Sequence, residues 1–309
     1  MHKTAAYAPG HITGIFYITD SDEDSMKKGS LGAGFSIVPG VTTSVSTMDE
    51  NSGPPLFLLN DAKGLDLPVS SLLYRYFIQS LPKKPHRPLL IEHRIEAPQG
   101  SGFGTSGAGA LSLALALNKY FDFPFEKKRA SQFAHLVEVE CKTGLGTVIG
   151  EYFGGFEIRT VSGAPGIGRI ESVPYPGGLK AVFAVRGPSL TSKALSDPDV
   201  RARVNLAGRD NLSRLKNNPD IENFLYFSRR FSAQTGLMTP WVESVLEVLE
   251  KKGIIGSMLM FGEAVFTLVD SSEALPLTEM LSTLYAHSET GREINIFSAD
   301  INSTGGIYL

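Results

Sequence analysis

Apolar residues recur with two different periods along the chain, which predicts a protein that mixes strands and helices. Alternation with β-branched and aromatic residues indicates strands, whereas apolar spacings of three and four indicate helices. In the first half, these patterns predict strands over 7–18, 35–38, 41–48, 56–59 and 89–96, and helices over 70–80, 110–118 and 127–142.

The second half shows the same two patterns in a different order. Thr239 followed by Pro240 is typical of a helix start, with an N-cap residue and a proline in the first turn. We place a domain boundary near residue 175, so that 1–175 and 176–309 form two domains. The patterns predict helices over 191–205, 223–235 and 239–252, strands over 179–185, 294–297 and 305–308, with the last two paired, and two strands within 256–269 joined at Gly262.

A glycine-rich segment, 98–109, lies between a predicted strand and a predicted helix. Its glycines permit positive φ angles, so several N–H groups can converge on one anion. The apolar run behind it favours a helix, whose N-terminus attracts phosphate. The hydroxyls of Thr105 and Ser106 can ligate a Mg²⁺ ion. A tight strand-to-helix turn without a ligand is the alternative for this segment.

Composition narrows the classes of partner. The 309 residues are 42% hydrophobic, which is enough for a large core, and the net charge of -3 disfavours nucleic acid as the main partner. A small metabolite fits better. A single cysteine, Cys141, cannot form an intramolecular disulfide, and no apolar run is long enough to span a membrane. We therefore expect a cytoplasmic protein, and we also expect a homodimer.

The segment 98–109 resembles the ATP-phosphate motif of the GHMP small-molecule kinases, a family that includes galactokinase, homoserine kinase and mevalonate kinase. The resemblance implies an α+β protein with the GHMP kinase fold: an N-terminal α/β domain that carries a glycine-loop-to-helix phosphate site, and a C-terminal ferredoxin-like domain. It also implies ATP and Mg²⁺ as cofactors. The residues implied to contact the ATP phosphates are Gly100, Ser101, Gly102, Phe103, Gly104, Thr105, Ser106 and Gly107.

The same resemblance implies a metal site. In GHMP kinases a glutamate on the helix that corresponds to 127–142, a few residues before a glycine-rich turn, completes the Mg²⁺ site opposite the loop serine. Glu138 matches that position by spacing and Glu140 is the alternative, so Ser106 and Glu138 are the expected metal ligands. One carboxylate, one hydroxyl and phosphate oxygens form a normal set of Mg²⁺ ligands.

The expected catalytic residues are His11 and Thr147. In many relatives an aspartate seven residues before a double glycine is assigned as the base that deprotonates the acceptor hydroxyl, and here that position holds Thr147. A threonine cannot take this proton at neutral pH. His11 follows an Ala-Pro-Gly motif that resembles the start of GHMP kinases, so we expect it to orient or partly deprotonate the acceptor.

A second glycine-rich stretch, 29–34, follows two lysines. It is either a hairpin turn or a nest of N–H groups for a substrate carboxylate. The third GHMP motif, within 256–269, contains Met258 and Met260 where relatives are richer in glycine. The expected substrate-binding residues are His11, Lys28, Ser30, Gly32 and Arg186.

Four segments, 8–16, 29–34, 143–146 and 235–239, together resemble the archaeal pantoate kinases within this family. These enzymes phosphorylate the primary hydroxyl of pantoate to 4-phosphopantoate on the archaeal route to coenzyme A. The resemblance implies pantoate as the substrate. Two alternatives stay open: homoserine kinase or another hydroxy-acid kinase, and a non-catalytic protein that binds a nucleotide or metabolite.

Overall fold

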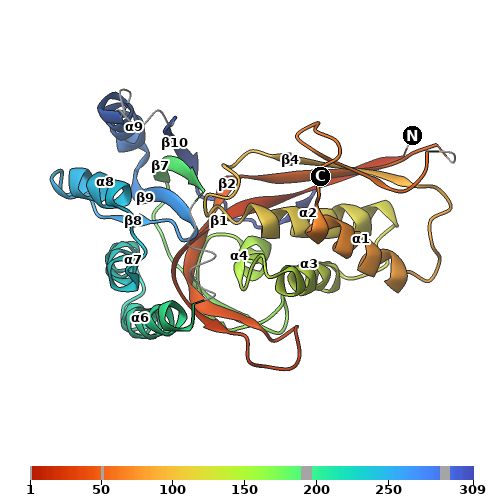
Figure 1. The fold of residues 1–309 in the computed structure, drawn as a ribbon, viewed down its shortest axis with the longest axis horizontal. Helices are drawn as coiled ribbons and strands as arrows, with labels where there is room; N and C mark the ends of the chain where they lie inside the picture. Colours follow the sequence, from red (N-terminus) through yellow and green to blue (C-terminus); the bar gives the residue numbers. More distant parts are fainter. Residues whose placement is uncertain (1, 50–51, 189–196, 286–292) are drawn as a thin grey trace.

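The computed structural model describes residues 2–49, 52–188, 197–285 and 293–309 (Figure 1). The first half contains β1 (Lys3–Thr19), β2 (Gly29–Thr47), β3 (Leu56–Leu59), α1 (Pro68–Ser80), β4 (Leu89–Ile95), α2 (Thr105–Tyr120), α3 (Lys127–Cys141), α4 (Thr147–Phe153), β5 (Phe156–Val161) and β6 (Arg169–Val173). The second half contains β7 (Leu179–Pro188), α6 (Pro198–Asn217), α7 (Ile221–Thr235), α8 (Pro240–Glu250), β8 (Gly256–Met258), β9 (Gly262–Asp270), α9 (Ser271–Tyr285), β10 (Asn295–Asp300) and β11 (Ile307–Tyr308).

The first sheet is organised around two long antiparallel strands, β1 and β2, which pair from Lys3 opposite Ser46 to Thr19 opposite Gly29. Its strand order is β11-β1-β2-β4-β3, and β5 pairs with both β2 and β6. Helices α1, α2 and α3 lie together on one side of this sheet (Figure 1). In the described segments no helix is both long and apolar enough to cross a bilayer.

The second sheet has the order β10-β7-β9-β8, and all of its neighbours are antiparallel. If β7, β8, β9 and β10 are numbered 1 to 4 in sequence order, the order across the sheet is 4-1-3-2. This is the ferredoxin-like arrangement, so the α+β class and the ferredoxin-like second half are confirmed. Helices α6, α7, α8 and α9 accompany this sheet (Figure 1).

Strands β1 and β2 contribute to two hydrophobic cores. Near the start of β1, Ala6 and Ala8 pack in a core with α1, α2 and α3. Farther along, Ile12 and Ile15 belong to a core that includes the second sheet and α6 to α8. A register shift between Pro9 and Gly10 lies at the change from one core to the other. His11 therefore stands where the two halves of the molecule meet.

The stretch 29–34 is neither a turn nor a nest, which corrects both predictions for it. These residues lie inside the extended strand β2, so their N–H groups do not converge. A Cβ on Gly32 would lie 2.2 Å from the Ile15 carbonyl oxygen, and one on Gly34 would lie 2.4 Å from that of Ile12. Glycine is needed here because β1 passes so close, not because the backbone turns.

Several predicted boundaries in the second half were wrong. The predicted helix 191–205 begins outside the described residues, and α6 runs from Pro198 to Asn217, through a polar stretch interpreted as a break. That stretch is helical because buried Ala207, Leu212 and Leu215 recur on one face, while most of its charged residues lie on the exposed face. The predicted pairing of 294–297 with 305–308 does not occur, since β10 pairs with β7 and β11 with β1. Helix α9 was not predicted.

The close contact between α6 and β1 gives a test of this packing. A Cβ on Gly208 would lie 2.0 Å from the Phe16 carbonyl oxygen, so Gly208→Ala should destabilise the protein by about 1–3 kcal/mol. The matched control is Gly109→Ala in α2, where a new Cβ meets no atom within 4 Å. That change should stabilise by up to about 1 kcal/mol through helix propensity. Urea unfolding measures both, and equal effects would contradict the packing.

Candidate active site

The glycine loop, residues 100–107, connects β4 to α2 through backbone conformations that favour glycine. Gly100, Gly102 and Gly104 have φ angles of 70°, 91° and 67°. A Cβ on Gly102 would lie 2.3 Å from the Met260 carbonyl oxygen, so this position also lacks space for a side chain. The loop is consequently held against the segment between β8 and β9.

The glycine loop leads into α2, whose N-terminus has no side-chain cap. Gly104 is the N-cap residue of α2 and provides no side chain to bond the first N–H groups. Ser101 and Phe103 are buried, and Phe103 packs on Phe183 and Phe297. Thr105 and Ser106 are half-buried. The first turn of α2 thus presents N–H groups and hydroxyls together, which suits an anion such as phosphate.

Ser106 and Glu138 meet directly. Ser106 Oγ donates to Glu138 Oε1 at 2.5 Å, and Thr143 Oγ1 donates to the same oxygen at 2.7 Å. Burial raises the pKa of the Glu138 carboxyl, and these two hydrogen bonds act in the opposite direction. Glu140, the alternative ligand, lies on the exposed side of α3 and accepts a bond from Tyr76. Geometry therefore favours Glu138.

The donor set at this position fits a hard cation. A buried carboxylate and a hydroxyl provide the oxygen ligands that Mg²⁺ prefers, and phosphate oxygens can complete the set. Across the described residues, no group of three or more His, Cys, Asp or Glu side chains is arranged to hold a metal ion. A cation at Ser106 and Glu138 would therefore depend on the ligands that a bound phosphate brings.

His11 is buried in an ionic cluster. Its Nε2 lies 2.8 Å from Glu157 Oε1, and Arg159 Nη1 donates to that same oxygen at 2.5 Å. Its Nδ1 lies 3.3 Å from Thr13 Oγ1, while its backbone N–H donates to the Phe103 carbonyl at 2.9 Å. Both ring nitrogens have partners inside the protein. This geometry favours a positioning role for His11 over proton transfer.

Three functional candidates were missed by sequence reasoning: Glu151, Glu157 and Arg159. The last two follow the double glycine at 154–155 at alternate positions of β5, so both side chains lie on one face. Burial lowers the pKa of the Arg159 guanidinium, and the charge of Glu157 opposes this effect. Two charged residues at i and i+2, alternating with the apolar Phe156 and Ile158, would have been the signal.

Glu151 is the least satisfied polar group near the loop. It is fully buried, and neither carboxyl oxygen has a hydrogen bond of normal geometry to any described residue. A Cβ on Gly104 would lie 2.8 Å from Oε1, and one on Gly107 would lie 2.7 Å from Oε2. The carboxyl thus lies directly beneath the start of α2. Recognising 147–153 as a helix would have placed it there.

The environment of Glu151 favours its neutral form. Burial raises the pKa of this carboxyl well above its usual value, and the nearby charge of Glu138 raises it further, with a smaller contribution from Glu157. The side chain of Thr147 acts in the opposite direction. A carboxyl of this kind retains its proton at a pH at which an exposed glutamate has lost it.

Two of the expected substrate-binding residues, Ser30 and Gly32, lie close to Arg159. A Cβ on Gly146 would lie 2.5 Å from Ser30 Oγ and 3.5 Å from Arg159 Nε, and one on Gly32 would lie 2.6 Å from Arg159 Nη2. Gly146 immediately precedes Thr147. The turn before α4 therefore connects the Ser30 and Arg159 pair with the carboxylate of Glu138, whose Oε2 would lie 2.4 Å from a Cβ on Gly144.

Arg186 and Lys28, the two basic residues expected to bind substrate, lie in different parts of the structure. Arg186, on β7, donates to Glu263 at 3.3 Å, and Glu263 also accepts from Thr239 at 2.9 Å. This group adjoins the glycine loop, because a Cβ on Gly262 would lie 2.1 Å from the Ser101 carbonyl oxygen. Lys28 is half-buried at the residue before β2. The structure thus does not gather all the expected substrate-binding residues at one point.

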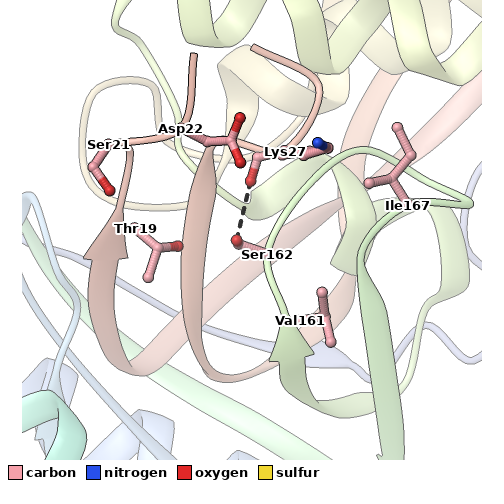
Figure 2. A pocket seen from close by; sticks show the side chains of 7 residues that line it. All are labelled: Thr19, Ser21, Asp22, Lys27, Val161, Ser162 and Ile167. Atoms are coloured by element: carbon pink, nitrogen blue, oxygen red, sulfur yellow. Dashed lines mark hydrogen bonds between the residues drawn. The ribbon is translucent and has the colours of Figure 1, made fainter. Parts of the chain in front are cut away.

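A surface pocket of about 450 Å³ opens beside the connection between β1 and β2 (Figure 2). The Ser162 hydroxyl donates to the Lys27 carbonyl at 3.0 Å across it. The pocket lies beyond the Ser30 end of β2, because Thr19 pairs with Gly29. It is therefore not formed by the glycine loop. Its lining consists of Thr19, Ser21, Asp22, Lys27, Val161, Ser162 and Ile167.

The raised pKa of Glu151 predicts a pH dependence of stability. A carboxyl whose pKa is higher in the folded protein stabilises it at low pH, and this stability is lost as the pH rises from about 4.3 through the folded-state pKa. Glutamine mimics the neutral carboxyl. The free energy of unfolding of Glu151→Gln, relative to the unmodified protein, should therefore increase from pH 4.5 to pH 8 in urea titrations. Parallel profiles would contradict the raised pKa.

Known proteins resemble this chain in sequence. A profile of the GHMP kinases N terminal domain matches residues 69–155, which include the glycine loop, Glu138 and Glu151. The pantoate kinase of Thermococcus kodakarensis is 30% identical over 282 residues, which cover 90% of this chain and 92% of that protein. The pantoate kinase of Methanocaldococcus jannaschii is 31% identical over 278 residues, with 90% and 96% covered.

A solved structure agrees with the sequence relatives. A phosphotransferase related to the CoA biosynthesis pathway superposes with a TM-score of 0.85 at 29% identity, covering 100% of this chain and 99% of that chain. Similarity at this level extends over both sheets rather than over the glycine loop alone. The resemblance inferred from the motifs is confirmed, and the chain belongs to the pantoate kinase family, a branch of the GHMP kinases.

Proposed function

We propose that this protein transfers the γ-phosphoryl group of ATP to the primary hydroxyl of pantoate, forming 4-phosphopantoate and ADP. The observation that carries the proposal is the hydrogen-bonded pair of Ser106 and Glu138 at the open N-terminus of α2. It occurs in a chain that is similar to pantoate kinases over 90% of its length. A kinase of this family needs these two features to hold a nucleotide and its cation.

The nucleotide side of the site is assigned to the glycine loop. The N–H groups from Gly104 to Gly107 would bind the phosphates, and the remaining predicted loop contacts, from Gly100 to Phe103, would shape the loop around them. Ser106 and Glu138 would hold Mg²⁺. When bound, that ion neutralises charge on the phosphate oxygens, which carry the developing charge in phosphoryl transfer.

The substrate side is assigned to the turn before α4. Pantoate carries a carboxylate, and Arg159 is a buried cation next to the Ser30 hydroxyl. Its Nε has no hydrogen-bond partner in the described part of the chain, so it retains a donor for an incoming anion. Arginine suits planar recognition of a carboxylate.

The predicted substrate contacts of Lys28, Gly32 and Arg186 stay predictions. The cytoplasmic location and the homodimer also stay predictions.

His11 contributes to this site by position. Its ring contacts Glu157, whose carboxylate also binds Arg159. Its backbone N–H bonds the carbonyl of Phe103 in the glycine loop. His11 thus connects the residues assigned to the substrate carboxylate with those assigned to ATP, which fixes the distance between donor and acceptor. Alignment of this kind provides much of the rate acceleration in phosphoryl transfer.

Purified protein tests the assignment with ATP and Mg²⁺ in a coupled assay of ADP release over pantoate, homoserine and mevalonate. We expect ADP formation with pantoate well above the other two, and phosphorus NMR should identify 4-phosphopantoate. Preference for homoserine or mevalonate would replace the substrate assignment. Tight ATP binding without ADP formation on any of the three would favour a non-catalytic binding protein.

Glu138→Ala tests the metal site. Removing the carboxylate should lower kcat by at least about a hundredfold, as expected for loss of a major electrostatic stabiliser. Circular dichroism and thermal unfolding establish that the variant is folded. The matched control is Glu140→Ala on the same helix, which should retain activity close to that of the unmodified protein. Substantial activity of a folded Glu138→Ala variant would remove Glu138 from the metal site.

A further inference from the structure

Phosphoryl transfer to an alcohol releases a proton that some group must accept. The acceptor oxygen forms a bond to the γ-phosphorus, the bond from that phosphorus to the ADP oxygen breaks, and the hydroxyl proton leaves. This inference rests on the proposed function and asks which group of the chain takes that proton. A suitable group is basic, lies at the junction of the nucleotide and substrate sides, and has an unoccupied acceptor position.

Most basic groups at this junction are already engaged. Glu138 accepts bonds from Ser106 and Thr143. Glu157 shares Oε1 between His11 and Arg159, and its Oε2 has no hydrogen-bond partner among the described residues but belongs to a carboxylate already paired with that guanidinium. Both ring nitrogens of His11 have neighbours within the protein. Protonation of any of these three groups would weaken a hydrogen bond or an ion pair that it already makes within the protein.

Glu151 differs from all of them. Both of its oxygens lack a hydrogen bond of normal geometry within the described residues, although the side chain is fully buried. Burying a carboxyl that has only the Thr147 side chain as a hydrogen-bonding neighbour is costly, so a fold does not retain one for stability alone. The two oxygens lie against Gly104 and Gly107, the positions at which the loop becomes α2. The unsatisfied group thus adjoins the proposed phosphate site.

Thr147 lies between Glu151 and the accessible side of the turn. The two residues are four positions apart on α4, so they share one face of the helix. Thr147 Oγ1 would lie 2.6 Å, and Glu151 Oε2 2.7 Å, from a Cβ on Gly107. Thr147 is half-buried, whereas Glu151 is completely buried. A hydroxyl in this place can receive one proton as it donates its own.

We propose that Glu151 accepts the proton of the acceptor hydroxyl through the hydroxyl of Thr147. The substrate proton passes to Thr147 Oγ1, the original Thr147 proton passes to the Glu151 carboxylate, and the new O–P bond forms as the bond to ADP breaks. The threonine is unchanged at the end of the step. The enzyme returns to its starting state when Glu151 releases its proton after the products leave.

The electrostatic setting is compatible with this role. Burial together with the charge of Glu138 raises the pKa of Glu151, which makes its carboxylate a stronger base than that of an exposed glutamate. The demand on the base is modest, because the transition state of phosphoryl transfer is loose. We therefore expect an effect at the lower end of the range for general base catalysis.

Three variants test the relay: Glu151→Gln, Thr147→Val and their combination. Each single change should lower kcat with pantoate by about a hundredfold. The KM for ATP and the calorimetric affinity for a non-hydrolysable ATP analogue should stay within about twofold, because the relay acts only on the proton. The combined variant should be no worse than either single one, since the two groups act as a unit.

A relocated carboxylate provides the rescue. Thr147→Asp combined with Glu151→Gln moves the carboxylate one helical turn toward the accessible side, and it should recover at least about tenfold of the lost kcat. A purely structural role of Glu151 would give no rescue and would lower the unfolding temperature and the analogue affinity. Thr160→Val, at a hydroxyl on β5 outside this group, controls for loss of a threonine.

The outcomes separate the two proposals. If the unmodified protein phosphorylates pantoate and folded Glu151→Gln keeps more than half of that kcat, the relay is wrong and the proposed function stands. Multiplicative losses in the combined variant would also overturn the relay. If the unmodified protein transfers phosphate to none of the hydroxy acids, the proposed function fails and the relay fails with it.

Discussion

The structure depends on how closely the glycine loop approaches three other elements. Gly102 lies against the segment between β8 and β9, while Gly104 and Gly107 lie against β1 and α4. A Cβ at any of the three would come within 2.8 Å of an atom in these elements. The loop therefore connects the two sheets through close approaches to the Met260 carbonyl and to the side chains of α4, which glycine favours, and it fixes the N-terminus of α2 at the junction of both cores.

The close approach of the glycine loop to its neighbours brings several buried ionisable side chains together. Glu138, Glu151 and Glu157 are buried around the start of α2, and Arg159 is the fully buried arginine among the described residues. Buried carboxylates are costly unless they are paired or neutral. Glu157 is paired with Arg159, Glu138 receives two hydroxyl bonds, and Glu151 has neither an ion pair nor a hydrogen bond of normal geometry among the described residues. The positive end of α2 offsets part of this charge, and a divalent cation on Glu138 would offset more.

Much of the site was predictable because it follows the order of the chain. Strand, glycine loop and helix are adjacent in sequence, and Glu138 lies on the next helix at a spacing typical of the family. The ferredoxin-like second half was implied by the resemblance to GHMP kinases, and the predicted alternation of strands and helices is compatible with it. These features depend on local patterns, which a single sequence displays directly.

What the sequence did not reveal depends on pairing between distant strands. The stretch 29–34 was predicted to be a hairpin turn or a nest of N–H groups because it is rich in glycine, whereas its glycines are required by the close approach of β1. Arg159 and Glu157 join His11 only through the pairing of β5 with β2. Glu151 was missed because α4 has only seven residues and lies between two glycines, so it is too short to show the apolar spacing of a helix. Register across a sheet cannot be deduced from such patterns alone.

The most direct test of this account is a crystal structure with a non-hydrolysable ATP analogue and Mn²⁺, which substitutes for Mg²⁺ and gives an anomalous signal. The account predicts a Mn²⁺ peak between Ser106 Oγ and the Glu138 carboxylate, with the triphosphate along the N–H groups from Gly104 to Gly107. A peak or a triphosphate bound elsewhere, with the first turn of α2 still bonded only to protein, would contradict it.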